Sequence, residues 1–124
     1  MEKTFIDTDI AIDFFRGYPK AFDFFKRKEG TILFSAITET ELLAGTHNND
    51  PEKRASTLKL LRTWRKVALG NPAARIAGDL CREQGMDIPD ATIAASALGC
   101  GAKLYTRNVK HFKNVPGLNV VAPY

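Results

Sequence analysis

The chain has 124 residues and a formal net charge of +4. This length fits one domain, which we expect to span residues 1–124, and excludes two substantial ones. The mild excess of positive charge suits a polyanionic or acidic partner without requiring one. The two cysteines have no paired spacing with another Cys or His, which argues against a disulfide framework and a zinc site.

The sequence shows no sign of a targeting or membrane segment. No basic stretch followed by an apolar one opens the chain, and no apolar run approaches the roughly 18 residues of a membrane span. We therefore expect no membrane partner and a cytoplasmic protein.

Short apolar runs alternate with segments of helical spacing along the chain. The runs predict interior strands at residues 3–6, 31–34, 103–106 and 119–121. Helical spacing, capping residues, Pro and Gly predict helices at 8–17, 19–30, 35–45, 51–69, 71–84 and 89–99, with a helical turn at 108–112. Because strands separated by helices form parallel sheets, we expect an α/β fold with helices on both faces of the sheet.

Polar residues follow several of the predicted strands. Asp7, Ser35 and Asn108 lie at or just beyond strand ends. Ligands of parallel sheets bind beyond the carboxyl ends of the strands, where the chain direction switches. This edge of the sheet is therefore the expected place of a functional site.

The most informative acid is Asp90, in the first turn of a predicted helix. At 100° per residue it shares a face with Ile93, Ala94 and Ala97, so its carboxylate should point inward. The alternative is an acid that only complements the helix dipole. Buried carboxylates are costly without a compensating charge, so acids that converge here would need a bound cation.

Other acids have simpler alternative roles. Glu41 shares a helical face with Ile37 and Ala44 but also fits an ordinary solvated glutamate. Asp7 and Asp9 come directly after the first strand, where either could do no more than cap and charge the following helix. We expect Asp13 and Asp87 to be surface charges.

Four segments in this order resemble a known family. They are Ile6–Asp9, Ser35–Gly45, Ile88–Ala95 and Leu104–Phe112, and together they look like the motifs of PIN domains. Within that family the sequence is most similar to VapC-type toxins of toxin-antitoxin pairs. The likeness covers almost the whole chain, and it implies a single PIN-like domain with a parallel central sheet.

The resemblance implies a set of catalytic residues. The metal-binding acids of the family fall on Asp7 and Asp90, its supporting acid on Glu41 and its strand-end polar group on Asn108. Many members carry a further aspartate at one of the positions held here by Asn108 and His111. Asp9 stands where the family often has Asn.

The residue types indicate the chemistry. Oxygen ligands without Cys favour Mg²⁺ or Mn²⁺, with Asp7, Asp90 and Glu41 as ligands. Such an ion activates water and neutralises charge on phosphoryl oxygens, which predicts phosphodiester hydrolysis. By resemblance the substrate is RNA, so the expected enzyme is a Mg²⁺- or Mn²⁺-dependent endoribonuclease.

Several neighbouring residues are secondary candidates. Thr106 could hydrogen-bond a ligand carboxylate, and His111 could contact a metal or a phosphate or simply lie at the surface. Three basic residues near the expected site could contact an RNA backbone or only face solvent; they are Arg107, Lys110 and Lys113.

The resemblance also implies partners. The family commonly forms homodimers and is inhibited by a small antitoxin that covers the active cleft. The basic helix that carries Trp64 could bind RNA, but its apolar spacing is more typical of a core or a dimer face. Some of the aromatic residues in the pairs Phe14–Phe15 and Phe24–Phe25 could meet a partner.

Other function classes fit less well. A dehalogenase-like phosphatase would need a later lysine and an acid pair after another strand, and Lys103 precedes its strand instead. A receiver domain would need an aspartate at Ser35. Two alternatives within the family stay open: a weakened module that binds RNA or protein without cleavage, and an RNA-processing nuclease with no antitoxin.

Overall fold

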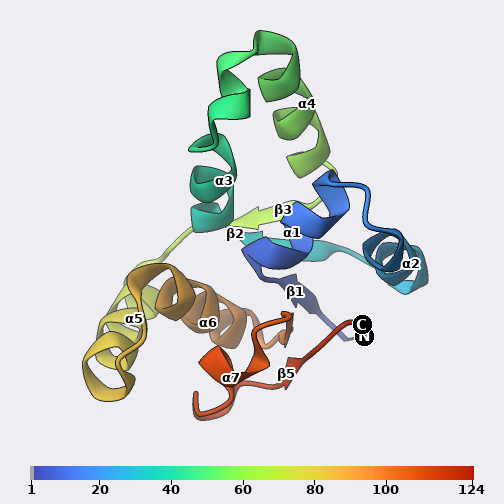
Figure 1. Ribbon diagram of the computed structural model, residues 1–124. Coiled ribbons are helices and arrows are strands. Elements are labelled where there is room, and N and C mark those ends of the chain that lie inside the picture. Colours follow the sequence, from blue (N-terminus) through green and yellow to red (C-terminus); the bar gives the residue numbers. More distant parts are fainter. Residues whose placement is uncertain (1) are drawn as a thin grey trace.

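The computed structural model describes residues 2–124 and is built on one parallel sheet (Figure 1). Five strands lie in the order β3-β2-β1-β4-β5. Their bounds are β1 Thr4–Ile6, β2 Ile32–Ser35, β3 Arg65–Val67, β4 Lys103–Tyr105 and β5 Val120–Val121. Every neighbouring pair is parallel, so all carboxyl ends lie at the same edge.

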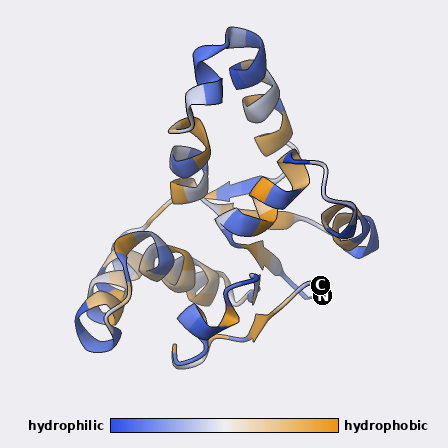
Figure 2. Ribbon diagram, in the orientation of Figure 1, coloured by the Kyte–Doolittle hydropathy of each residue, from blue (hydrophilic) through white to orange (hydrophobic). Residues whose placement is uncertain are grey.

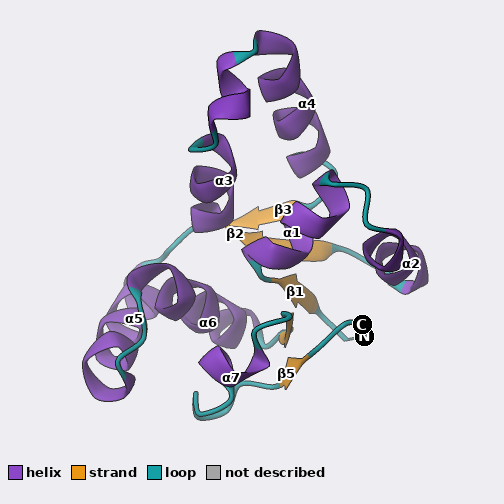
Figure 3. Ribbon diagram, in the orientation of Figure 1, coloured by secondary structure: helices purple, strands orange, loops and turns teal. Residues whose placement is uncertain are grey.

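Helices make the remaining regular structure of the described residues (Figure 3). They are α1 Thr8–Phe15, α2 Pro19–Arg27, α3 Ala36–Leu43, the 3₁₀ turn η1 Thr46–Asn49, α4 Pro51–Leu61, α5 Asn71–Gln84, α6 Ile88–Cys100 and α7 Val109–Phe112. The segment from α3 through η1 to α4 rises away from the sheet, and its outer end is the most hydrophilic part of that arm (Figure 2).

The alternation of side chains along the strands builds two cores. Phe5, Leu33 and Leu104 point to the face covered by α5 and α6, where they pack with the alanine-rich side of α6. Ile6 and Tyr105 point to the opposite face, among side chains of α1 and α2. The expected α/β fold with helices on both faces of a parallel sheet is therefore confirmed.

The predicted helix over residues 51–69 is wrong in its second half. Helix α4 ends at Leu61, a turn follows, and Arg65–Val67 joins the sheet as β3 beside β2. The side chains of Arg65 and Lys66 are exposed, so this edge strand shows no apolar alternation in the sequence. Its strand conformation depends on backbone pairing with β2, which no local pattern reports.

The topology places one set of strand ends together. Strand β1 lies between β2 and β4, and the chain direction switches on either side of it. The residues that follow these strands, Asp7 after β1 and Thr106 after β4, therefore meet at one edge. In the part of the chain from residue 2 onward, no helix combines the length and apolarity needed to cross a bilayer.

Candidate active site

Asp7 is the most buried acid at the carboxyl edge of the sheet, with 5% of its surface exposed. It caps α1, because its Oδ1 accepts a 2.7 Å hydrogen bond from the backbone N–H of Thr8. Its Oδ2 accepts a 2.8 Å hydrogen bond from the Thr106 hydroxyl at the end of β4. Of the two acids that could cap this helix, Asp7 is the cap, and both of its carboxylate oxygens are held in place.

Asp9 faces the loop between β4 and α7. Its Oδ2 accepts hydrogen bonds from the backbone N–H of Arg107 at 2.9 Å and from the Asn108 amide at 3.5 Å. The Thr106 hydroxyl lies 3.4 Å from the same oxygen. The other oxygen, Oδ1, is buried and has no hydrogen-bond partner among residues 2–124. Asp9 therefore presents one committed oxygen and one available oxygen at the site.

Glu41 reaches the site from α3. Its Oε1 accepts a 2.7 Å hydrogen bond from the Thr8 hydroxyl, which also lies 2.8 Å from the hydroxyl of Thr38. This link joins the first turn of α1 to α3. Sequence reasoning did not single out Thr8 or Thr38, although Thr8 lies between two candidate acids and on the same helical turn.

Asp90 lies in the first turn of α6 and is half-buried. Its backbone N–H donates to Oδ1 of Asp87, which caps the helix and is exposed as predicted. Its own Oδ2 lies 3.3 Å from Nδ1 of His111 on α7. The structure therefore brings His111 onto a candidate metal ligand, while leaving more than half of the imidazole exposed.

The acids influence one another's ionisation. Burial first, and the nearby charge of Asp9 second, raise the pKa of Asp7 to about 7. Burial also raises the pKa of Asp9, against the hydrogen bond from Arg107. Burial and the charge of Asp87 raise the pKa of Asp90, while His111 opposes the shift. Simultaneous ionisation of Asp7, Asp9 and Asp90 is therefore unfavourable unless a bound positive charge compensates them.

The donor set is compatible with a hard divalent cation. All candidate ligands are carboxylate oxygens, and Asp9 has a buried oxygen to spare. Across residues 2–124, however, no three Asp, Glu, His or Cys side chains lie close enough to enclose a metal by themselves. The acids that were expected to converge therefore form a loose cluster and not a closed set of metal ligands. Mg²⁺ fits such a cluster, because it retains several waters and uses one or two carboxylates.

Asp13 was expected at the surface, and that prediction is wrong. It is 8% exposed and forms a fork with Arg107, at 2.8 Å to Nε and 3.2 Å to Nη2. The hydroxyl of Tyr124 donates a 2.7 Å hydrogen bond to the same carboxylate. Asp13 lies one helical turn after Asp9, and this spacing was the signal for its inward direction. The network fixes the loop whose backbone holds Asp9.

The three basic candidates differ in their surroundings. The guanidinium of Arg107 forms an ion pair with Asp13. Lys110 and Lys113 have no ionic partner among the described residues, and Lys110 lines a pocket of about 610 Å³ that includes Asp90 and His111. Only Lys110 therefore combines an available charge with a position in a pocket at the acid cluster.

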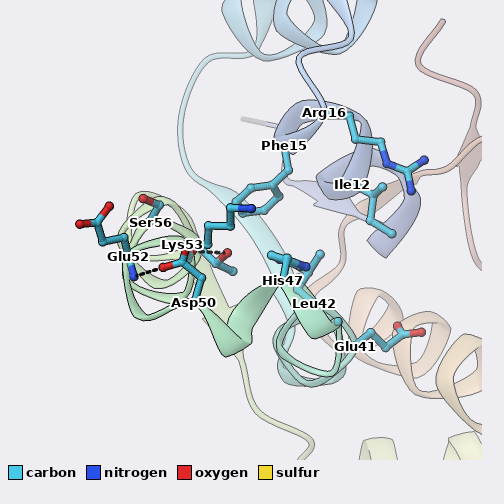
Figure 4. A pocket seen from close by; sticks show the side chains of 12 residues that line it. Ile12, Phe15, Arg16, Glu41, Leu42, His47, Asp50, Glu52, Lys53 and Ser56 are labelled. Carbon is cyan, nitrogen blue, oxygen red and sulfur yellow. Dashed lines mark hydrogen bonds between the residues drawn. The ribbon is translucent and has the colours of Figure 1, made fainter.

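Trp64 belongs to the core and does not form a basic RNA-binding face. Its ring stacks on Phe25 with centroids 5.0 Å apart and meets Phe14 edge-on. Phe24 is buried as well. Phe15 is the member of the two aromatic pairs that lines a pocket of about 680 Å³ between α1 and the arm (Figure 4).

The fold and the acid-lined sheet edge define an α/β protein with a candidate site for an oxygen-bound cation. The sequence profile of the family described as PIN domain matches residues 4–118. Ribonuclease VapC19 of Mycobacterium tuberculosis is 34% identical over 121 residues, covering 91% of this chain and 94% of the relative. Ribonuclease VapC1 of Rickettsia felis is 32% identical over 126 residues, covering 94% and 92%.

A solved structure is similar throughout. The toxin-antitoxin complex from Klebsiella pneumoniae contains a chain that matches with a TM-score of 0.84 and 32% identity, over 98% of both chains. The chain belongs to the PIN domain family. The resemblance and the fold expected from the sequence are both confirmed.

Proposed function

We propose that this PIN domain is a metal-dependent endoribonuclease and the toxin of a toxin-antitoxin pair. One observation carries the proposal: Asp7, Asp9, Glu41 and Asp90, from three separate segments, lie at one sheet edge. There, burial and neighbouring carboxylates raise the pKa values of Asp7 and Asp90, and Thr8 links Glu41 to the first turn of α1. Similar proteins named ribonucleases and a similar toxin-antitoxin complex support it. We propose the cytoplasm as its place of action, in keeping with RNA as the proposed substrate.

Asp7, Asp90 and Glu41 are the proposed ligands of Mg²⁺ or Mn²⁺, with Asp9 as a further donor. The bound ion supplies activation of water and neutralisation of charge on the phosphoryl oxygens. The protein's contribution is to hold the donors. Thr106 and the Thr8 backbone orient Asp7, and the Thr8 hydroxyl holds Glu41. Asn108 supports Asp9 through its amide.

An antitoxin is the proposed protein partner. The apolar pocket, lined by Ile12, Phe15 and Leu42, has Glu41 at its edge and charged residues of the arm on its rim (Figure 4). A segment seated there would reach the acid cluster, which supports inhibition by covering the site. A homodimer is proposed by family resemblance, as the state in which the toxin acts.

The test is RNA cleavage by the purified chain with Mg²⁺ or Mn²⁺, compared with EDTA. Asp90→Asn should lower the cleavage rate by about two orders of magnitude, as expected for loss of a preorganised charged group. Asp23→Asn, the same change at an exposed position on α2, is the control and should cleave like the wild type. Metal-independent cleavage, or equal rates for Asp90→Asn and the wild type, would contradict the proposal.

A weakened PIN module is the second candidate function. It is favoured by the loose acid cluster and by Asn108 and His111, at one of whose positions many members of the family carry a further aspartate. RNA binding without metal-dependent scission would support this candidate over the nuclease. A small reading frame for an antitoxin immediately upstream would favour the toxin over a processing nuclease.

A further inference from the structure

Two buried threonines link the first turn of α1 to α3. The Thr8 hydroxyl lies 2.8 Å from the hydroxyl of Thr38 and donates a 2.7 Å hydrogen bond to Oε1 of Glu41. Thr8 is 7% exposed, and Thr38 is fully buried. A buried hydroxyl needs a hydrogen-bond partner, because leaving it unpaired costs free energy. The three side chains therefore form one hydrogen-bonded chain across the contact between α1 and α3.

The hydrogen bonds of this chain run in one direction. A hydroxyl has a single proton to donate, and an ionised carboxylate can only accept. The proton of Thr8 therefore goes to Glu41, and Thr38 is the donor in the contact between the two hydroxyls. Thr38 thus occupies an acceptor position of Thr8 and keeps the Thr8 proton directed at Glu41.

Glu41 gains a defined position from this contact. It is exposed on α3, and a long side chain in such a place loses rotamer freedom when it is fixed on a ligand. A side chain that is held in place before the ligand arrives avoids much of that cost. The hydrogen bond from Thr8 therefore prepares Glu41 for binding in the metal-free protein.

Thr8 also holds the acid that precedes it. Its backbone N–H donates a 2.7 Å hydrogen bond to Oδ1 of Asp7, the residue that caps α1. One residue thus contacts two proposed metal ligands, with its backbone on Asp7 and its side chain on Glu41. Because these two acids come from distant segments of the chain, Thr8 is the shared contact that relates their carboxylates to each other.

We propose that Thr8 and Thr38 are positioning residues that hold Glu41 ready for a divalent cation. Thr8 acts directly on the carboxylate, and Thr38 acts through Thr8. The inference rests on the proposed metal-dependent function, in which Glu41 is a ligand. The positioning role requires no contact of either threonine with the metal or with RNA.

Mn²⁺ binding to the purified chain, measured by isothermal titration calorimetry without RNA, tests this role. Thr8→Val keeps the side-chain shape and the backbone N–H to Asp7 but removes the hydroxyl. It should weaken Mn²⁺ binding about tenfold, at the lower end of the range for a residue that holds a metal ligand. Thr8→Ser keeps the hydroxyl and should stay within about threefold of the wild type. Thr4→Val, the same change at a buried threonine at the amino end of β1, should change the affinity by less than about twofold.

A double variant separates positioning from packing. Thr38→Val alone should weaken Mn²⁺ binding about threefold, because the Thr8 hydroxyl still reaches Glu41. Thr8→Val/Thr38→Val should bind Mn²⁺ as weakly as Thr8→Val, because Thr38 acts through Thr8. In urea denaturation with EDTA, however, the double variant should recover most of the midpoint that Thr8→Val loses, because neither hydroxyl is then left buried and unpaired.

Kinetics provide an independent measurement. In cleavage assays at a fixed Mn²⁺ concentration, Thr8→Val should lower kcat about tenfold and leave the KM for RNA within about twofold. This division is expected because the hydroxyl acts on a metal ligand and not on the substrate.

The outcomes separate the positioning role from the nuclease. Equal Mn²⁺ affinities of Thr8→Val and the wild type, in a protein that binds the ion and cleaves RNA, would overturn the positioning role and leave the nuclease intact. A double variant that regains Mn²⁺ affinity together with stability would also overturn it, since the loss would then come from packing. A wild type that neither binds Mn²⁺ nor cleaves RNA would overturn both.

Discussion

At the scale of single residues, Asp7 shows how burial and charge set the properties of the site. Its carboxyl group is buried just after β1, and this burial together with the charges of Asp9 and Asp90 raises its pKa to about 7. Hydrogen bonds from Thr106 and from the Thr8 backbone limit this rise. At neutral pH the metal-free protein therefore holds a carboxyl group that is only partly ionised.

The raised pKa predicts a pH-dependent stability of the metal-free chain. Between the unfolded pKa of about 3.9 and the folded pKa of about 7, the folded state binds more protons than the unfolded state. The free energy of unfolding should therefore fall as pH rises through this window, by up to about 4 kcal/mol. Urea denaturation in EDTA between pH 4 and 8 measures it.

The variant Asp7→Asn isolates this contribution. It cannot ionise, so much of the decline in stability between pH 4 and 7 should disappear, and above pH 7 the variant should exceed the wild type. Asp23→Asn should retain the full decline, because its carboxyl group is exposed. An identical pH profile for Asp7→Asn and the wild type would exclude Asp7 as the source.

At the scale of elements, an aromatic cluster fixes the helices that border the site. Trp64, in the turn between α4 and β3, stacks on Phe25 of α2 and meets Phe14 of α1 and Phe34 of β2 edge-on. Aromatic pairs in these geometries add to the stabilisation by buried area. The cluster therefore sets the position of α1, whose first turn carries Asp7 and Asp9.

Truncation of Trp64 tests this role. Trp64→Ala should lower the free energy of unfolding by about 3 kcal/mol, because it leaves a cavity among three elements. Circular dichroism during urea denaturation measures the change. Phe22→Ala should be milder, at about 1 kcal/mol, since Phe22 is 38% exposed. A larger loss for Phe22→Ala than for Trp64→Ala would contradict the assigned packing.

At the scale of the whole molecule, folding and metal binding should be coupled. The acid cluster draws Asp7 and Asp9 from the start of the chain, Glu41 from the arm and Asp90 from α6, so the unfolded chain has no such site. A cation that binds only the folded state stabilises it by about 2.7 kcal/mol at a hundredfold excess over its Kd.

The coupling predicts a rise in melting temperature with Mn²⁺ or Mg²⁺. For a chain of 124 residues this stabilisation corresponds to roughly 10 °C. Differential scanning calorimetry of the wild type and Asp90→Asn, each with metal and with EDTA, measures it. Asp90→Asn should lose most of the rise and Asp23→Asn none. Equal rises in all three proteins would point to a different binding site.

Local patterns in the sequence were sufficient for most elements and for the main acids. Apolar runs and capping residues predict four of the strands and most helices, because these depend on side chains near in sequence. Asp90 is recognisable because helical spacing turns it inward. The four motifs identify the family, and with it Asp7, Glu41 and Asn108 as candidates.

Tertiary structure decided what depends on distant partners. Strand β3 forms because β2 offers it backbone hydrogen bonds, while its exposed side chains carry no pattern. Asp13 is buried because two residues more than 90 positions away satisfy it: the Arg107 guanidinium compensates its charge and Tyr124 donates a hydrogen bond. Sequence patterns report local energetics, whereas these features arise from contacts that only folding brings together.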